Sequence, residues 1–429
     1  MFKFFPSNER KMRENAANWL QLADKILHYR RDQLTGAQTQ ELRQKTADLR
    51  LKLDQRADAA RLKLGIESLE GLLQQVGGTF YPKSSIVENV EFFLVAAIIV
   101  LGIRTYFVQP FKIPTNSMWP SYYGMTPQVF KQRAAEPGAL AMGARLLAFG
   151  ARPHRLDAPA DGEVLIPILG AESRGVVHSH IVTGQSWLVI PTKVREYTLL
   201  VGDEPVTVRV PLDFDFDWLV SEAFFSRGEG YSPEEFHEEL RRRVNTGEFE
   251  VHVVDGETLR CIRTGRRVRT GDRVLSFDLL TGDQLFVDRF SYHFVRPPIG
   301  SGFVFRTGNI PGIAETYGDQ YYVKRLVGKP GDALEIKNYR LYRNGSPITG
   351  AAAFEKNARH EGDYVGYRNV GALTAGETMR VPPRSFLALG DNSANSADGR
   401  VWGYVPEKDV IGRPLFIYYP FSLRWGPVR

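Results

Sequence analysis

A serine and a lysine stand far apart in this chain, each inside a distinctive phrase. Ser117 lies in Gln109-Pro-Phe-Lys-Ile-Pro-Thr-Asn-Ser-Met-Trp-Pro120, directly after a hydrophobic stretch. Lys324 lies in Tyr321-Tyr-Val-Lys-Arg-Leu-Val-Gly-Lys-Pro-Gly-Asp332, and a third phrase runs from Gly390 to Pro406. A serine hydroxyl is a poor nucleophile unless a nearby base takes its proton. Histidine is the usual base, yet none of the eight histidines lies in the three phrases.

In this order, and behind a segment of membrane length, the three phrases resemble the active-site boxes of bacterial type I signal peptidases (leader peptidases). Those proteins are membrane-bound serine proteases that remove signal peptides. The resemblance implies a Ser–Lys dyad, with Ser117 as nucleophile and Lys324 as general base. It also implies a mainly β fold, in which an antiparallel β catalytic core of the signal peptidase type follows an N-terminal α-helical region and one transmembrane helix.

A lysine base needs a lowered pKa. Free lysine titrates near pH 10.4, so only about one molecule in a few thousand is neutral at pH 7. The pKa of Lys324 must therefore fall by roughly two units or more, which burial against apolar groups supplies. Tyr322, Val323 and Leu326 provide such surroundings. Strand alternation sends the next residue, Arg325, to the opposite face.

Further residues receive roles from the resemblance alone. Ser396 matches the hydroxyl that positions the lysine amine, and three charged residues match those that brace the site: Asp391, Asp398 and Arg400. The backbone N–H of Ser117 and the hydroxyl of Thr115 match the oxyanion donors, and one such donor contributes roughly 2.7–4 kcal/mol.

The resemblance also implies shallow apolar pockets for the small side chains at a cleavage site. The matching residues are Phe111, Ile113, Pro114 and Val323. Two positions depart from the family pattern. Ser393-Ala394 replaces a more usual Arg-Asp pair, and Gly399 replaces a Ser. We expect these changes to alter the bracing of the loop and to leave the chemistry intact.

One segment has the hydropathy of a membrane helix. Phe92 to Ile103 contains no polar side chain, and apolar residues resume at Tyr106. Its length lies at the lower limit for spanning, which takes roughly 20 residues. We expect a permanent anchor over residues 84–108, because it lies too far from Met1 to be a cleaved signal peptide; a buried core helix is the alternative. The resemblance places the N-terminus in the cytoplasm and the catalytic core on the outer or periplasmic side of the cell (inner) membrane.

Residues 1–83 are predicted to be a cytoplasmic helical region. Trp19, Leu22 and Ile26 recur at helical spacing, and Thr35-Gly36 is a plausible break between two helices. This pattern favours a small helical hairpin or a coiled coil. A plain spacer is the simplest interpretation, and a module that docks an unknown partner or dimerises is the alternative.

The predicted catalytic core is interrupted. The core comprises residues 109–124 and 279–429. Residues 125–278 are an insertion of unknown fold that is mostly β. Within the insertion, Ser232–Asn245 is the segment predicted to be helical. The strand that usually follows the serine box almost at once corresponds here to Thr281–Tyr292. A similar phrase, Thr270–Asp278, precedes it and leaves two possible joins.

Composition excludes some classes of function. The net charge of +6 arises from 55 basic and 49 acidic residues, a balance that does not favour nucleic acid as a partner. The single cysteine, Cys261, excludes a disulfide within the chain and a cysteine-based metal cluster. The resemblance implies no cofactor.

Three other patterns carry weaker signals. His178-Ser-His180 places two imidazoles on one face of a strand, but no third metal ligand is evident, so no metal site is assigned. Asp213, Asp215 and Asp217 are expected on one face of a strand, where a solvated edge is the favoured interpretation and a cation site the alternative. The arginines between Arg260 and Arg273 are expected on a solvated hairpin, with contact to anionic membrane lipid as the alternative.

The sequence thus favours a membrane-bound signal peptidase I that cleaves N-terminal signal peptides from translocated preproteins. One alternative is a Ser–Lys protease with a specialised set of substrates. Another is a membrane-anchored assembly or scaffold protein that keeps the peptidase fold, although a scaffold would need neither Ser117, Lys324 nor Ser396.

Overall fold

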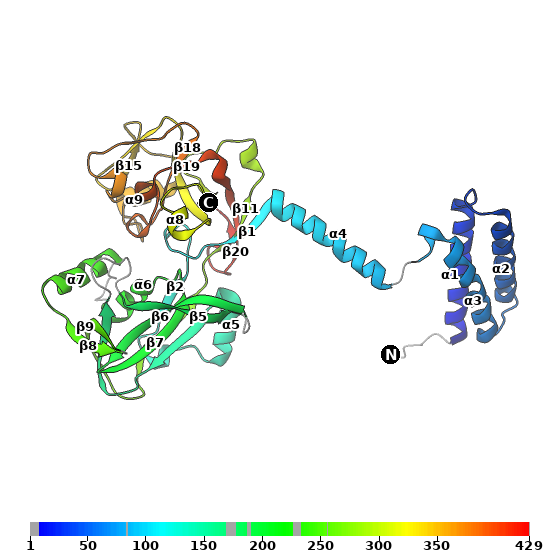
Figure 1. Cartoon of the computed structure of the whole chain (residues 1–429), viewed down its shortest axis with the longest axis horizontal. Helices are drawn as coiled ribbons and strands as arrows, with labels where there is room; N and C mark the ends of the chain where they lie inside the picture. Colours follow the sequence, from blue (N-terminus) through cyan, green and yellow to red (C-terminus); the bar gives the residue numbers. More distant parts are fainter. Residues whose placement is uncertain are drawn as a thin grey trace. The chain divides into compact units, whose positions relative to one another are not determined.

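The computed structural model describes residues 8–82, 85–168, 177–186, 190–225, 233–254 and 256–428. The chain divides into two compact units, Met1–Val100 and Leu101–Arg429. Each unit has its own hydrophobic core, so each is described separately (Figure 1).

Three helices form the first unit: α1 (Asn8–Tyr29), α2 (Gly36–Asp54) and α3 (Ala59–Val76). Their apolar faces meet in a core that includes Ile26, Leu49 and Leu69, each fully buried. The predicted break at Thr35 is the N-cap of α2, where its hydroxyl and the side chain of Gln38 form a capping box. The expected hairpin is incomplete, because a second break after Asp54 adds α3.

Helix α4 (Ser85–Tyr106) follows. Among the helices of the described residues, α4 alone is long and apolar enough to cross a membrane by length and composition. Its stretch Ile86–Tyr106 has a mean hydropathy of 2.3, and none of that window is buried. The alternative of a buried core helix is therefore wrong for this structure. The predicted first residue of the span, Ser84, lies outside the described residues.

A large antiparallel sheet, of eight strands in the described residues, carries the three phrases of interest. Its strands, in spatial order, are β1 (Val108–Lys112), β11 (Gln284–Asp288), β20 (Val410–Tyr419), β12 (Gly302–Arg306), β13 (Tyr321–Gly328), β18 (Ser385–Leu389) and β19 (Val405–Pro406), with β21 (Gly426–Pro427) paired to β20. Ser117 follows β1, Lys324 lies within β13, and the third phrase begins as β18 ends. Because β13 pairs with β18, Lys324 and the third phrase are neighbours by topology.

Several smaller elements complete this part of the chain. A second antiparallel sheet contains β16 (Ser346–Pro347), β15 (Arg340–Arg343), β14 (Ala333–Lys337) and β17 (Met379–Arg380). The helices are α8 (Ala314–Tyr317), α9 (Ala352–Arg359) and α10 (Gly399–Trp402).

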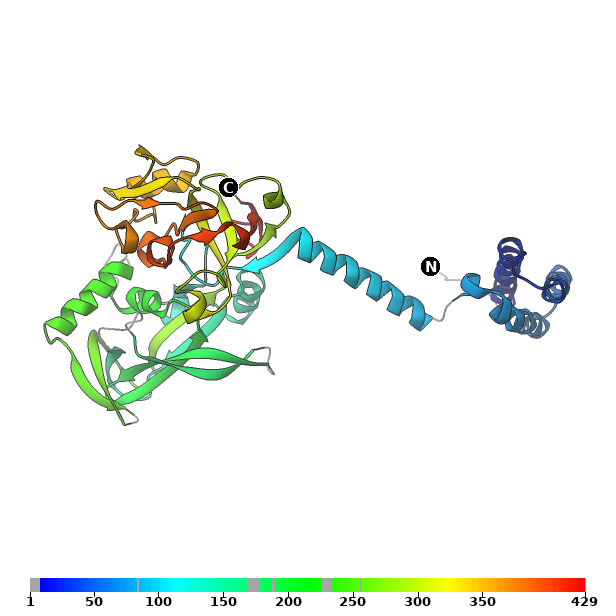
Figure 2. The same cartoon turned by 45° about the horizontal axis from the view of Figure 1, so that its top comes forward.

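The inserted segment builds its own sheet with its own core, in the green part of the chain beside the yellow-to-red core strands (Figures 1 and 2). Its strands are β5 (Ser179–Ser186), β6 (Ile190–Val201), β4 (Gly162–Ile168), β9 (Glu257–Val268) and β8 (Glu250–Val254), with β7 (Glu204–Pro211) paired to β6. Its helices are α5 (Ala139–Phe149), α6 (Phe216–Val220) and α7 (Pro233–Asn245). Helix α7 matches the predicted one, apart from Ser232, which lies outside the described residues.

Three strands join the insertion to the core: β2 (Thr126–Val129), β10 (Arg273–Leu280) and β3 (Arg152–Asp157). Strand β10 contains most of the earlier of the two similar phrases, and it pairs with β2 and β3. The later phrase contains β11, which pairs with β1. The strand that pairs with β1 thus lies in the later phrase, and β10 extends two residues beyond Asp278, the predicted end of the insertion.

Candidate active site

The turn after β1 meets strand β13. Lys324 Nζ donates a hydrogen bond to Ser117 Oγ at 2.5 Å and another to Ser396 Oγ at 3.3 Å. Three strands of the large sheet, β11, β20 and β12, separate β1 from β13 along its order, so the sheet must curl for this contact to form. An apolar cluster that includes Ile113, Met118 and Val304 packs between these elements.

Lys324 is buried, with 3% of its surface exposed. Burial lowers its pKa from 10.5 to about 8. The carboxylates of Asp398 and Asp391 oppose this shift, while Arg400 supports it. With a pKa of about 8, about a tenth of the molecules carry a neutral amine at pH 7. The surroundings of Lys324 therefore give it the character of a base.

Arg325 points away from the dyad, as strand alternation predicts. Its guanidinium forms a two-pronged ion pair with Asp391, with Nε–Oδ1 and Nη2–Oδ2 distances of 2.6 and 2.5 Å. It also donates to the carbonyl of Gly300 and to Ser121 Oγ. Arg325 and Asp391 thus brace β13 against the start of the third phrase from the side opposite Lys324.

A second buried ion pair holds the end of the third phrase. Arg400 and Asp398 have fully buried side chains, and Arg400 Nε and Nη2 donate to the carboxylate at 2.8 and 2.7 Å. Arg400 also donates to the hydroxyl and the carbonyl of Ser393, at 2.5 and 2.8 Å. Ser393, where the family more often has a charged residue, therefore accepts bonds from Arg400 and takes part in the bracing.

The third phrase also fixes the backbone around Ser117. The Asn392 side-chain amide donates to the carbonyl of Asn116 at 3.1 Å, and the Asn392 backbone N–H donates to the carbonyl of Ser117 at 3.2 Å. Gly390 permits this approach, since a Cβ there would lie 2.1 Å from Ser396 Oγ and 2.4 Å from the Ser117 carbonyl oxygen. Any larger residue at position 390 would push the two phrases apart.

The expected oxyanion donors lie beside the nucleophile. In the described part of the chain, the backbone N–H of Ser117 donates to no other backbone group. Thr115, two residues earlier, is exposed. Phe111 and Val323 are half-buried at the edge of the apolar cluster that contains the buried Ile113, and Pro114 is half-buried next to it.

Comparison with known proteins gives the same family throughout. A family model described as signal peptidase, peptidase S26, matches residues 272–419. A probable signal peptidase I-1 from Synechocystis sp. is 34% identical over 145 residues, which is 34% of this chain and 66% of that protein. An inactive signal peptidase IA from Staphylococcus aureus is 30% identical over 151 residues, which is 35% of this chain and 76% of that protein. The chain belongs to the signal peptidase I family.

Other members of the family match a similar share of the chain. A signal peptidase I from Leptolyngbya laminosa is 32% identical over 144 residues, covering 64% of that protein. The matched segments thus span about two thirds of the Synechocystis and Leptolyngbya proteins. A crystal structure of a signal peptidase I from Enterococcus faecalis aligns with 28% of this chain and 97% of that chain, at 25% identity and a TM-score of 0.20.

The family match confirms the predicted fold class: a mainly β protein with antiparallel sheets, N-terminal helices and one long apolar helix. The family model covers Lys324 and the third phrase but begins well after Ser117. The contact between Ser117 and Lys324 is what connects the isolated serine phrase to the matched segment.

The insertion contacts both phrases that surround Ser117 and Lys324. The indole of Trp218 packs edge-on against Trp119, two residues after Ser117, with ring centroids 5.1 Å apart. The side-chain amide of Asn395, next to Ser396, donates to Asp215 Oδ2 at 2.8 Å. Sequence reasoning missed both contacts, because they depend on how two separately built sheets meet.

A hollow of about 690 Å³ lies where the insertion meets the core. Its walls include His237 and Arg241 from α7, and Tyr339, Arg368 and Ala394 from the core. The hollow adjoins the third phrase through Ala394, one residue before Asn395.

The aspartates expected on one strand face lie elsewhere. Strand β7 ends at Pro211, and Asp215 is the N-cap of α6, where its carboxylate accepts from the N–H of Trp218. Asp217, inside α6, contacts His237 Nε2 at 3.0 Å. The strand prediction was wrong because a capping aspartate starts a helix there.

The arginine-rich segment is partly neutralised. Arg263 forms ion pairs with Glu163 and Glu250, and Arg273 pairs with Glu136 and Asp157. Others in the segment are exposed on the outer face of β9 or just after it: Arg260, Arg267 and Arg269. Only part of this basic run therefore remains available to an anionic surface.

Proposed function

We propose that this protein is an active signal peptidase I, a serine endopeptidase that cleaves N-terminal signal peptides from translocated preproteins. The proposal rests above all on the 2.5 Å contact between Ser117 Oγ and Lys324 Nζ, made by a lysine whose pKa is lowered to about 8. A buried amine in contact with a hydroxyl is the arrangement that activates a serine without histidine.

In this mechanism the neutral amine of Lys324 accepts the proton of Ser117 as the hydroxyl oxygen attacks the scissile carbonyl carbon. The Ser117 N–H and the Thr115 hydroxyl donate to the oxygen of the tetrahedral intermediate. The ammonium of Lys324 then gives its proton to the leaving amine, and an acyl-enzyme on Ser117 remains. Lys324 next deprotonates the water that hydrolyses this ester. Ser396 acts as a positioning residue by holding the amine.

Substrate choice would come from the apolar surface beside the dyad. Phe111, Ile113, Pro114 and Val323 lie around the strand end that leads to Ser117. A shallow surface of this kind accepts small side chains and excludes large ones, as cleavage after a signal peptide requires.

The proposal includes membrane anchoring through α4, with the N-terminus cytoplasmic and the catalytic core on the outer or periplasmic side. Membrane lipid would be a second partner. Of the basic run, Arg260, Arg267 and Arg269 are the residues that could add contact with anionic lipid, at up to about 1 kcal/mol each.

Two other functions remain distinct proposals. Relatives at 30% identity are named inactive, which keeps a role as a membrane-anchored assembly or scaffold protein in view. A protease with a specialised substrate set is favoured by a different observation: Trp218 and Asp215 of the insertion contact the phrases that carry Ser117 and Ser396. Substrates that approach the dyad would then meet the insertion as well.

Cleavage of a model preprotein by the full-length protein in detergent tests the proposal. Ser117→Ala and Lys324→Ala should each lower kcat/KM by about 10³-fold or more. Because the two residues act as a unit, the double variant should be no worse than either single variant. The exposed Ser346 and Lys337 give matched controls, Ser346→Ala and Lys337→Ala, which should cleave normally. Substantial cleavage by a folded Ser117→Ala protein would exclude the mechanism.

A further inference from the structure

Two histidines and a glutamate meet at one end of the insertion sheet. Strand β4 ends at Ile168, which forms a bridge to Val177 just before β5 and pairs with Arg260 near the start of β9. The starts of β5 and β9 are therefore anchored to the same residue. This register brings Glu257 next to His178 and His180, from which it is far in the sequence.

The spacing of these side chains suits ligands around a shared ion. Glu257 Oε2 lies 3.3 Å from His178 Nε2 and 3.7 Å from His180 Nε2. Both distances exceed the roughly 2.7–2.9 Å of a charge-assisted hydrogen bond. Ligand atoms about 2.0–2.2 Å from a tetrahedral zinc ion lie about 3.4 Å from one another. The two imidazole rings are also close, with centroids 4.6 Å apart.

We propose that His178, His180 and Glu257 bind one divalent transition-metal ion, with Zn²⁺ as the ion that the two-imidazole, one-carboxylate donor set fits best. Borderline metals prefer imidazole nitrogen, and Zn²⁺ takes His and Glu in tetrahedral sites that leave a fourth position to water. His178 is buried, whereas His180 and Glu257 are more than half exposed, so the ion has a route from solvent.

A neighbouring acid already has a partner. Glu196 lies opposite His180 on β6, and its carboxylate pairs with Arg209 Nε at 2.5 Å. The site is therefore formed by Glu257 and the two histidines.

The ion would tie β5 to β9 across the end of β4. Val177, directly before His178, donates its N–H to Asp217 at 3.3 Å, and Asp217 contacts His237 beside the hollow at the catalytic core. Metal binding should thus raise the thermal stability of the insertion. The proposed metal site lies apart from Ser117 and Lys324, so it does not depend on the proposed peptidase activity.

The test uses untagged full-length protein in detergent, from which a chelator has removed all metal. The protein is titrated with Zn²⁺, and the heat of binding and the concentration of free Zn²⁺ are measured. One equivalent should bind, and the unfolding temperature should rise. His180→Ala and Glu257→Gln should each weaken Zn²⁺ binding at least about tenfold, because each removes one of three protein ligands. Both side chains are exposed, so these variants should fold. His252→Ala is the control: it removes another insertion histidine, one paired with Asp203 and Glu250, and should bind Zn²⁺ like the wild type.

Co²⁺ provides an independent readout. In the chelator-stripped protein it should give the intense visible absorption of a tetrahedral site, which Zn²⁺ then abolishes, and Glu257→Gln should lose that absorption. Ser117→Ala should keep it, which separates this proposal from the fate of the peptidase mechanism. Zn²⁺ binding that is absent in the wild type, or unchanged in both ligand variants, would overturn the proposal.

Discussion

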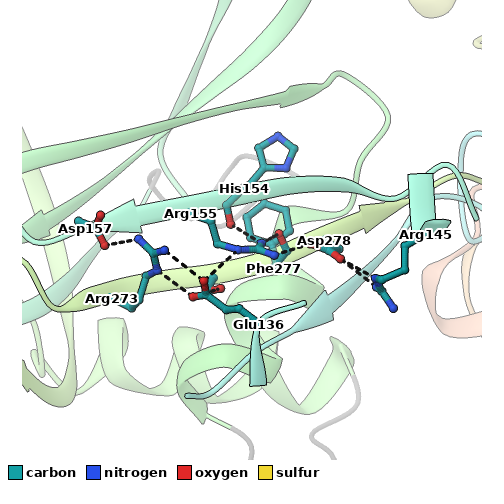
Figure 3. A network of polar contacts seen from close by, with 9 residues as sticks. Glu136, Arg145, His154, Arg155, Asp157, Arg273, Phe277 and Asp278 are labelled. Carbon is teal, nitrogen blue, oxygen red and sulfur yellow. Dashed lines mark hydrogen bonds and ion pairs between the residues drawn. The ribbon is translucent and has the colours of Figure 1, made fainter. Parts of the chain in front are cut away.

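Two regions of the second unit enclose basic side chains, and the two regions differ in the groups that contact these side chains: neutral hydroxyls in one and carboxylates in the other. In the catalytic core, Lys324 contacts the hydroxyls of Ser117 and Ser396. Beside β10, Arg155 and Arg273 lie among the carboxylates of Glu136, Asp157 and Asp278 (Figure 3). Hydroxyls do not neutralise a charge, so burial drives Lys324 toward its neutral form. Carboxylates do, so the arginines keep their charge and link strands.

The catalytic core also contains buried cations that are paired with carboxylates. Arg325 and Arg400 are as buried as Lys324, yet each has its own carboxylate, Asp391 and Asp398 respectively. Among the described residues of the core, the amine of Lys324 is the buried cation without a carboxylate partner. Arg325 and Arg400 thus each have an anion, whereas Lys324 has hydroxyl partners and a lowered pKa.

The largest effect should come from breaking a fully buried pair. Asp398→Asn would leave the Arg400 charge without its anion, which should lower the free energy of unfolding by about 3–5 kcal/mol. Denaturant unfolding of the full chain measures this loss. The matched control is Asp319→Asn, whose partner Arg306 is half exposed, so that its loss of stability should be much smaller. Equal losses in the two variants would contradict the comparison.

Lys324→Met should destroy activity and raise stability. Because the pKa of Lys324 is 10.5 when unfolded but about 8 when folded, the unfolded chain holds an extra proton between these values. Wild-type stability therefore rises with pH from 8 to 10.5, and below pH 8 the folded state bears the full penalty of a buried ammonium. Removing it should add about 2–3 kcal/mol at pH 7. Unfolding curves at pH 7 and above pH 10 check this, since the gain should shrink at high pH; Lys337→Met, at an exposed site, should show no gain.

The rate of cleavage should follow the same ionisation. Below the pKa of about 8, each unit of pH should lower single-turnover cleavage about tenfold, because only the neutral amine of Lys324 accepts the serine proton. Rates across this range, with folding checked at each pH, give the apparent pKa. A rising limb centred near 10.5, or no such limb, would show that burial does not tune this lysine.

The ion pair between Glu136 and Arg273 in the insertion should contribute less to the free energy of unfolding. The hydrogen bonds from Arg273 lower the pKa of Glu136 to about 2, so the contribution of this carboxylate to stability is present above pH 4.5 and is lost as pH falls from 4.5 toward 2. Solvent screening at this partly accessible site reduces the effect of Glu136→Gln to about 1 kcal/mol at pH 7. Unfolding at pH 7 and near pH 3 should show the difference from wild type fading at low pH. Glu377→Gln, at an exposed position, is the control and should show no difference at either pH.

The contact between Ser117 and Lys324 was predictable from sequence, because the two residues lie in phrases whose order survives the insertion. Strand alternation also gave the direction of Arg325, since that rule is local. The third proposed metal ligand, Glu257, was not predictable, because it reaches His178 only through the register of β4, β5 and β9. Helix α5 was missed as well: its apolar run, broken by Gly143, gave no clear helical pattern. Contacts that depend on pairing between distant segments cannot be predicted from local sequence patterns.

Breaking a contact between the insertion and the core should give the smallest effect on activity. It tests directly whether the insertion influences the residues around Ser396. Asn395→Ala removes the hydrogen bond to Asp215 one residue from Ser396. A bond of this kind contributes about 1 kcal/mol, so kcat should fall up to about fivefold while KM stays nearly constant. Asn309→Ala is the matched control, because it removes a similar amide–carboxylate bond, to Asp409, away from the dyad. Both variants should lose similar thermal stability, but only Asn395→Ala should lose kcat. If kcat falls equally in both, the insertion does not position the third phrase, and its contact with the core serves stability alone.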